Sequence, residues 1–228
     1  MAEMTLFSGP LSMFGAKVQI AALEKNLAVN IVMVPFTMDH RYDPKHPEVL
    51  RVNPKRQVPV FVHGDVEIFD STQIFEYFEH LQPHPPLWPA LPAARARARL
   101  LELKSDEVFF PHVIRLMGLQ DSLGEAAARE AIAQLLQYYE SVDAMLEGGD
   151  YIAGEYTYAD IAFYMAQIFA ARLGAPMTRA TPRLLAWRER LSARPAVHQT
   201  LLQFADSLVQ YNLRVPDFIE RALAAKSR

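Results

Sequence analysis

The stretch NPKRQVPVFVHGDVEIFDSTQIFEYFEHL, residues 53–81, contains the clearest local signals in this chain. Two short runs, VPVFV and VEIF, are rich in β-branched and aromatic residues and are separated by HGD, which predicts a hairpin. The residues that follow, STQIFEYFEHL, predict a helix with one apolar stripe. This stripe consists of Ile74, Phe75, Phe78 and Leu81. The stretch is therefore expected to fold as strand, strand and helix.

The residues before this stretch predict a strand, a helix and a second strand. MTLFS (4–8) and AVNIVMV (28–34) are short and apolar, as strands of a buried sheet are. Between them, apolar residues recur with helical spacing at Val18, Ala21, Ala22 and Leu23. A β-α-β unit needs a crossover connection, so we expect its two strands to be parallel. Residues 1–82 are therefore predicted to form an α/β domain.

After this domain the pattern changes to helices only. The stretch QPHPPLWPALP (82–92) is dense in proline, so we interpret residues 83–92 as a linker between domains. Three later stretches have a helical period: AARARARLLELKSDEVFF, AAAREAIAQLLQYYESVDAMLE and TYADIAFYMAQIFAARL. Residues 93–228 are therefore predicted to form an all-helical domain.

Several polar residues and prolines indicate where these later helices begin. Thr157 and Asp160 have the spacing of a capping box, which we assign to folding and not to catalysis. Thr181–Pro182 combines a residue suited to the N-cap with a proline at the first helical position. Two more helices are expected to start near Pro195 and Pro216.

The composition excludes several kinds of protein and of site. Of 228 residues 51% are hydrophobic and 21% charged, and the formal charge of −3 gives no basic surplus for nucleic acid or an anionic membrane. The chain has no cysteine, which excludes disulfides, thiolate metal sites and a cysteine nucleophile. Any thiol chemistry therefore needs a thiol supplied by a ligand. No metal site is predicted, because Pro83 interrupts any helix that would align His80 with His84.

Neither a signal peptide nor a membrane span is expected. The first residues, MAEMTLFSG, contain Glu3 and no basic segment, and charged or amide residues interrupt every long apolar run. We therefore expect a cytoplasmic protein.

Three short segments carry the candidate chemistry, and each also has a structural explanation. Ser12 precedes a helix, where it either serves as the N-cap or offers its hydroxyl to a ligand. Pro59 cannot donate to a sheet, which leaves the backbone of Val58 available to another partner. Asp70 or Ser71 caps the helix after the hairpin, and together they offer sites for a carboxylate and an ammonium group.

These segments, in this order, resemble the cytosolic glutathione transferases, notably the serine-type plant phi class and its bacterial relatives. The resemblance is carried by SGPLSMFGAKVQIAALEKNL, by NPKRQVPVFVHGDVEIFDSTQIFEYF, by GEYTYADIAFY and by PRLLAWRERLSARPAV. It implies a thioredoxin-like domain followed by an all-helical domain, with glutathione as the co-substrate. It also implies a homodimer.

The resemblance implies a role for each matching residue. Ser12 would hydrogen-bond the glutathione sulfur and activate the thiol. The Val58 backbone would pair with the cysteinyl backbone, with Pro59 in the cis form. Ser71 would bind the γ-glutamyl carboxylate and Asp70 would lie near its ammonium group. The glycine carboxylate would be contacted by Gln57, or by Arg56 or His40, and the sequence leaves open which of the three holds it. Arg56 alternatively faces water. Arg56 stands where the family often has glycine.

The resemblance also places an electrophile pocket beside the glutathione site. It would be lined by Phe14, Phe109, His112, Val113 and Leu116, although the default interpretation of the apolar residues in VFFPHVIRLMG (108–118) is a helix core. We expect a transferase that attacks a small hydrophobic or polar electrophile. The alternatives are a non-catalytic binding or interaction module of the same fold, and a glutathione-dependent peroxidase.

Overall fold

The computed structural model describes residues 2–43, 45–119, 122 and 124–226. The chain divides into two compact units. The first unit contains residues 1–86 together with residues 196–228, and the second contains residues 87–195. Among the described residues, no helix is both long and apolar enough to cross a lipid bilayer.

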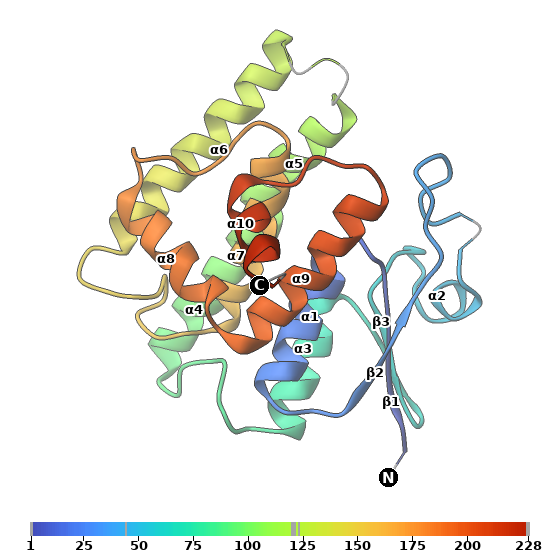
Figure 1. The fold of residues 1–228 in the computed structure, drawn as a ribbon. Helices are drawn as coiled ribbons and strands as arrows, with labels where there is room; N and C mark the ends of the chain where they lie inside the picture. Colours follow the sequence, from blue (N-terminus) through green and yellow to red (C-terminus); the bar gives the residue numbers. More distant parts are fainter. Residues whose placement is uncertain (1, 44, 120–121, 123, 227–228) are drawn as a thin grey trace. The chain divides into compact units, whose positions relative to one another are not determined.

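The first unit is built on a four-stranded sheet with the order β2-β1-β3-β4 (Figure 1). The strands are β1 (Met4–Ser8), β2 (Val29–Met33), β3 (Val60–His63) and β4 (Val66–Phe69). β1 and β2 are parallel and joined by helix α1 (Met13–Glu24), whereas β3 and β4 form an antiparallel hairpin. The parallel unit and the hairpin expected from the sequence are both confirmed.

Alternation along the strands gives the sheet two apolar faces. Leu6 and Phe61 point to one face and pack with Val18 of α1 and Phe78 of helix α3 (Ser71–Leu81). Figure 1 shows α1 and α3 side by side against the sheet. On the other face, Val60 packs with Val49 of helix α2 (Pro47–Val52).

Helix α2 (Pro47–Val52) was not predicted from the sequence. His46 caps it, since its Nδ1 accepts a hydrogen bond from the Glu48 N–H (3.2 Å), and Pro47 occupies the first turn. Six residues are too few to display a helical period, which explains why the pattern missed this helix.

The last two helices, α9 (Pro195–Gln210) and α10 (Asp217–Lys226), start where the prolines predict. However, the sequence pattern groups residues 93–228 in one helical domain, whereas the contacts in the structure group residues 196–228 with the sheet. One link is the ring of Tyr211, which lies 4.9 Å from the ring of Phe36 after β2.

In the described part of the second unit, all regular elements are helices. They are α4 (Pro92–Lys104), η1 (Ser105–Phe109, a π-helix), α5 (Phe110–Gly118), α6 (Ala126–Met145), α7 (Tyr158–Arg172) and α8 (Pro182–Ser192). The helical period of residues 93–110 is confirmed by α4, but this period did not predict that the helix changes to a π-helix at Ser105. Helix α7 is buried along nearly its whole length and forms the centre of this unit.

The capping box predicted at the start of α7 is confirmed. The Asp160 carboxylate accepts hydrogen bonds from the Thr157 N–H (2.9 Å), the Ile152 N–H (3.1 Å) and the Trp187 indole N–H (2.8 Å). Asp160 is fully buried, so these bonds join the start of α7, the loop before it and α8 into one polar centre.

Candidate active site

Ser12 caps helix α1, and its hydroxyl oxygen accepts a hydrogen bond from the Gly15 N–H (3.0 Å). The Ser12 N–H in turn donates to the Gly9 carbonyl (3.1 Å), which closes a tight turn between β1 and α1. Because the oxygen serves as the acceptor, the hydroxyl proton can be donated to a third group. Only 8% of Ser12 is exposed, so this donor lies in a largely dehydrated place at a helix N-terminus.

Gly15 separates Ser12 from a second serine, Ser8, at the end of β1. A Cβ at Gly15 would collide with the Ser8 hydroxyl and would lie 3.3 Å from the Ser12 hydroxyl. Ser8 is fully buried and accepts a hydrogen bond from the side-chain amide of Gln19 (3.0 Å). Sequence reasoning missed this pair, although a glycine in the first turn of a helix is a signal of close packing.

The loop before β3 is held by Asn53, which sequence reasoning also missed as a site residue. Asn53 is buried, and its side-chain amide donates to the Gln57 carbonyl (2.6 Å) and accepts from the Lys55 N–H (2.9 Å). Arg56 adopts the left-handed conformation with φ of 58°, which explains why glycine suits this position. The Val58–Pro59 peptide bond is cis, as the resemblance implies.

Asp70, and not Ser71, is the cap of helix α3. Its carboxylate accepts hydrogen bonds from the Thr72 N–H (3.0 Å) and the Gln73 N–H (3.3 Å). Asp70 also has a left-handed backbone with φ of 76°, a conformation that a non-glycine residue adopts only at a cost. Ser71 is the first residue of the helix and is buried at 3% exposure, so its hydroxyl lies at the positive end of α3.

The sheet register brings these three segments to the same end of the sheet. Phe7 at the end of β1 pairs with Val60 at the start of β3, and Val60 pairs with Phe69 at the end of β4. The turn before α1, the cis-proline loop and the start of α3 therefore emerge at the same end of adjacent strands. This end of the sheet combines a hydroxyl donor, the backbone of the cis-proline loop and two helix N-termini, a set that suits a ligand with peptide and carboxylate groups.

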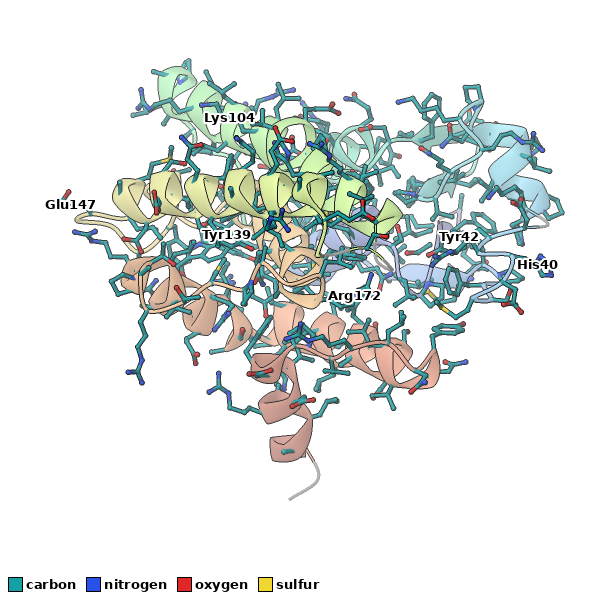
Figure 2. All side chains as sticks on the ribbon, turned by 90° about the horizontal axis from the view of Figure 1, so that it is seen from above. His40, Tyr42, Lys104, Tyr139, Glu147 and Arg172 are labelled. Atoms are coloured by element: carbon teal, nitrogen blue, oxygen red, sulfur yellow. The ribbon has the colours of Figure 1, made fainter. Side chains whose placement is uncertain are left out.

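The histidines of the segment between β2 and α2 have different positions. His40 is exposed, and only its backbone N–H is bonded, to the Thr37 hydroxyl (3.1 Å). Figure 2 shows His40 at the outer edge of the first unit, with Tyr42 set further in. His46 caps α2, which gives it a structural role. Contacts of His40, Arg56 or Gln57 with a ligand stay predictions, and all three side chains are exposed.

Three of the residues expected at the electrophile pocket have the burial of core residues. The Phe109 ring lies 5.4 Å from that of Tyr139 and 5.2 Å from that of Phe163, inside the second unit. Val113 and Leu116 are also fully buried. This burial agrees with the default interpretation of that helix as core, and a role for the three in substrate binding stays a prediction.

The other two expected pocket residues are less buried. His112 is partly exposed on α5, and Phe14 is partly exposed on α1, where the Lys17 ammonium lies 5.4 Å from its ring centroid. Within the described parts of the chain, no group of three or more His, Asp or Glu side chains has an arrangement that would hold a metal ion.

Comparison with known proteins identifies the family. One model, described as the glutathione S-transferase N-terminal domain, matches residues 6–86, and one for the C-terminal domain matches residues 106–195. Glutathione S-transferase 3 of Zea mays is 31% identical over 216 residues, which cover 88% of this chain and 94% of that protein. The chain belongs to the glutathione S-transferase family. Its predicted fold, a thioredoxin-like domain plus a helical domain, is thereby confirmed.

Solved structures agree with this glutathione S-transferase fold. Glutathione transferase F7 from Populus trichocarpa superposes with a TM-score of 0.75 over 88% of this chain and 99% of that chain. The two sequences are 20% identical, so this likeness concerns the fold alone.

A second group of relatives carries a different name. The stringent starvation protein A homolog of Coxiella burnetii is 38% identical over 109 residues, which cover 47% of this chain and 48% of that protein. The match thus spans about half the length of this curated relative. Within the glutathione S-transferase family, the chain is therefore similar both to transferases and to proteins not named for a transferase activity.

Proposed function

We propose that this protein is a glutathione transferase in which the Ser12 hydroxyl donates a hydrogen bond to the glutathione sulfur. The observation that carries the proposal is that three segments meet at the same end of the sheet: the Ser12 turn, the Val58–Pro59 loop and the Asp70–Ser71 pair. Family membership supports glutathione as the co-substrate.

The chemical contribution of Ser12 is to favour the thiolate over the thiol. A free thiol has a pKa of about 8.5, so little of it is ionised at neutral pH, although the thiolate is the nucleophile. A hydrogen bond to the charged form lowers that pKa, and each unit corresponds to about 1.4 kcal/mol. One hydroxyl at a helix N-terminus supplies roughly one to two units. Ser12 acts as a donor and forms no covalent bond.

The rest of the glutathione molecule would be held by backbone and by charge. The Val58 backbone would pair with the cysteinyl residue. Ser71, at the positive end of α3, would bind the γ-glutamyl carboxylate, and the Asp70 carboxylate would attract its ammonium group. The exposed side chains after Asn53, namely Arg56 and Gln57, would reach the glycine carboxylate, with help from His40.

Ser12→Ala tests the proposal, provided that the loss of the helix cap is controlled. We expect kcat to fall about tenfold to a hundredfold, as loss of about 1.4–3 kcal/mol of thiolate stabilisation implies, with a much smaller change in glutathione affinity. Ser12→Asp restores a good N-cap without a hydroxyl donor, and its kcat should stay as low as that of Ser12→Ala. Ser141→Ala, which removes an exposed hydroxyl that bonds only its own helix, should behave as the unmodified protein. Equal losses of kcat and of glutathione binding in Ser12→Ala would contradict the role.

The similarity to stringent starvation protein A homologues favours a second candidate, a binding or interaction module of the same fold without turnover. Saturable glutathione binding without product, across a panel of electrophiles and organic hydroperoxides, would support this candidate. Turnover of hydroperoxides alone would indicate a glutathione-dependent peroxidase instead.

A further inference from the structure

The side chain of Tyr42 lies directly on the turn that positions Ser12. A Cβ at Gly9 would be 2.5 Å from the Tyr42 hydroxyl oxygen and 2.5 Å from its Cε1. Gly9 is the residue whose carbonyl accepts from the Ser12 N–H. Because real side chains never approach so closely, the contact between Tyr42 and this turn depends on the absence of a side chain at Gly9.

The Tyr42 hydroxyl is buried and has no hydrogen-bond partner of normal geometry among the residues that the structure describes. Burial raises the pKa of Tyr42 to about 12, and this effect outweighs the Leu11 backbone, which lowers that pKa. Tyr42 is therefore neutral at physiological pH and cannot act as a base. A buried hydroxyl that is neither ionised nor fully bonded calls for an explanation in terms of what it contacts.

Phe36 packs against Tyr42, and Tyr211, which follows helix α9, packs against Phe36 in turn. The ring of Phe36 lies 4.8 Å from the ring of Tyr42 and 4.9 Å from the ring of Tyr211, edge to face in both cases. The Tyr211 hydroxyl, just after α9, also donates to the Phe36 carbonyl (3.4 Å). The three rings thus connect the C-terminal end of α9 with the turn before α1.

Helix α9 also lies beside Ser12 itself. A small cavity next to Ser12 is lined on its other side by Thr200, Gln203, Phe204 and Ser207 of α9. The C-terminal segment therefore reaches the turn at two places, through the aromatic rings and along this cavity.

We propose that Tyr42 is a positioning residue for Ser12, pressed onto the Gly9–Leu11 turn by Phe36 and by Tyr211 of the α9 segment. The inference rests on the proposed function of Ser12 and adds to it the part that keeps the hydroxyl donor in place. Loss of the Tyr42 ring frees the turn and weakens the hydrogen bond from Ser12 to the thiolate.

The test is the pKa of the thiol of bound glutathione, followed by thiolate ultraviolet absorbance in the whole protein. Tyr42→Leu should raise this pKa by about half a unit to one unit, the size that one weakened hydrogen bond implies. Tyr42→Phe keeps the ring edge over Gly9 and should raise it less. Tyr77→Phe is the matched control, since it removes a hydroxyl bonded to His63 (2.8 Å) on the same unit, and it should leave the pKa unchanged.

A second pair of variants tests the contact between Gly9 and Tyr42, and again the thiol pKa is measured and not the stability of the protein. Gly9→Ala places a Cβ against Tyr42 and should raise the thiol pKa, whereas the double variant Gly9→Ala/Tyr42→Leu makes room for it. We therefore expect the two substitutions to be non-additive in the thiol pKa, with the double variant shifted by less than the sum of the single shifts.

The outcomes separate this inference from the proposed function. A normal thiol pKa in the unmodified protein would refute the function of Ser12, and the role of Tyr42 with it. The thiol pKa could instead be lowered in the unmodified protein, rise in Ser12→Ala and stay unchanged in both Tyr42→Leu and Tyr42→Phe. This result would overturn the role of Tyr42 but not the function of Ser12. Additive shifts in Gly9→Ala and Tyr42→Leu would also overturn it. The order unmodified, Tyr42→Phe, Tyr42→Leu in rising pKa supports it.

Discussion

Four single residues of the candidate site have either an unusual backbone conformation or a close contact at the Cα atom. Arg56 and Asp70 adopt left-handed conformations beside the site, which costs a non-glycine residue free energy. Gly9 and Gly15, in contrast, leave room for Tyr42 and for the Ser8 hydroxyl. Backbone strain at Arg56 and Asp70 and close packing at Gly9 and Gly15 therefore both occur in the segments that form the candidate site.

Gly15→Ala tests this close packing. In an ordinary helix, alanine in place of glycine is favourable by about 1 kcal/mol. At position 15, however, the new Cβ would collide with the buried Ser8 hydroxyl, and overpacking of this kind costs about 1–3 kcal/mol. We therefore expect the free energy of unfolding in urea to decrease.

The matched control is Gly118→Ala at the end of α5, where no atom lies within 4 Å of the new Cβ. This variant should be neutral or slightly more stable. If Gly15→Ala were as stable as Gly118→Ala, the packing of Ser8 and Ser12 around Gly15 would be wrong.

At the scale of the elements, the start of α7 is held by one buried polar residue, Asp160. Burial raises the pKa of Asp160 to about 6, although hydrogen bonds from Trp187, Thr157 and Ile152 lower it. The folded protein thus binds this proton more tightly than the unfolded chain, in which an aspartate has a pKa of about 3.9. The stabilising contribution of the protonated group is complete below about pH 4 and is lost as the pH rises through about 6.

Urea unfolding between pH 4 and pH 7 checks this dependence against Asp160→Asn, which does not titrate. The asparagine variant should be less stable than the unmodified protein at both pH 4 and pH 7, because its NH₂ group faces the Thr157 N–H. We expect the stability difference between the two proteins to shrink by up to about 3 kcal/mol as the pH rises. A difference that stays constant, or grows, would contradict the raised pKa.

On the scale of the whole molecule, we propose the homodimer that the family resemblance implies. Two leucines one turn apart on α4 support a contact there, since 49% of Leu100 and 52% of Leu103 is exposed. Light scattering at micromolar concentration should give twice the mass of the 25.8 kDa chain.

Leu103→Glu should raise the dimer dissociation constant at least about tenfold, which corresponds to about 1.4 kcal/mol. Val209→Glu places the same charge on α9 at a side chain of similar exposure (59%), and it should leave the dimer unchanged. A monomeric mass for the unmodified protein would reject the dimer, and equal effects of both variants would reject the contact through α4.

The grouping of α9 with the sheet is also a property of the whole chain. The periodicity of residues 195–210 predicts a helix, and that helix is present, but a period does not say against which part of the chain its apolar face packs. The rings of Phe36 and Tyr211, which are far apart in the sequence, settle this question within the first unit.

The sequence by itself determined the strands, nearly all helices, the hairpin and the capping box at Thr157, because each depends on neighbours within a few residues. The resemblance added the order of Ser12, Val58–Pro59 and Asp70–Ser71. Only the tertiary structure decided that the sheet register brings these segments to the same end of the sheet, and that Tyr42 lies on Gly9. It alone revealed the buried supports Ser8 and Asn53. These features arise from pairing and packing between distant residues, and no local pattern of hydrophobicity or capping encodes such contacts.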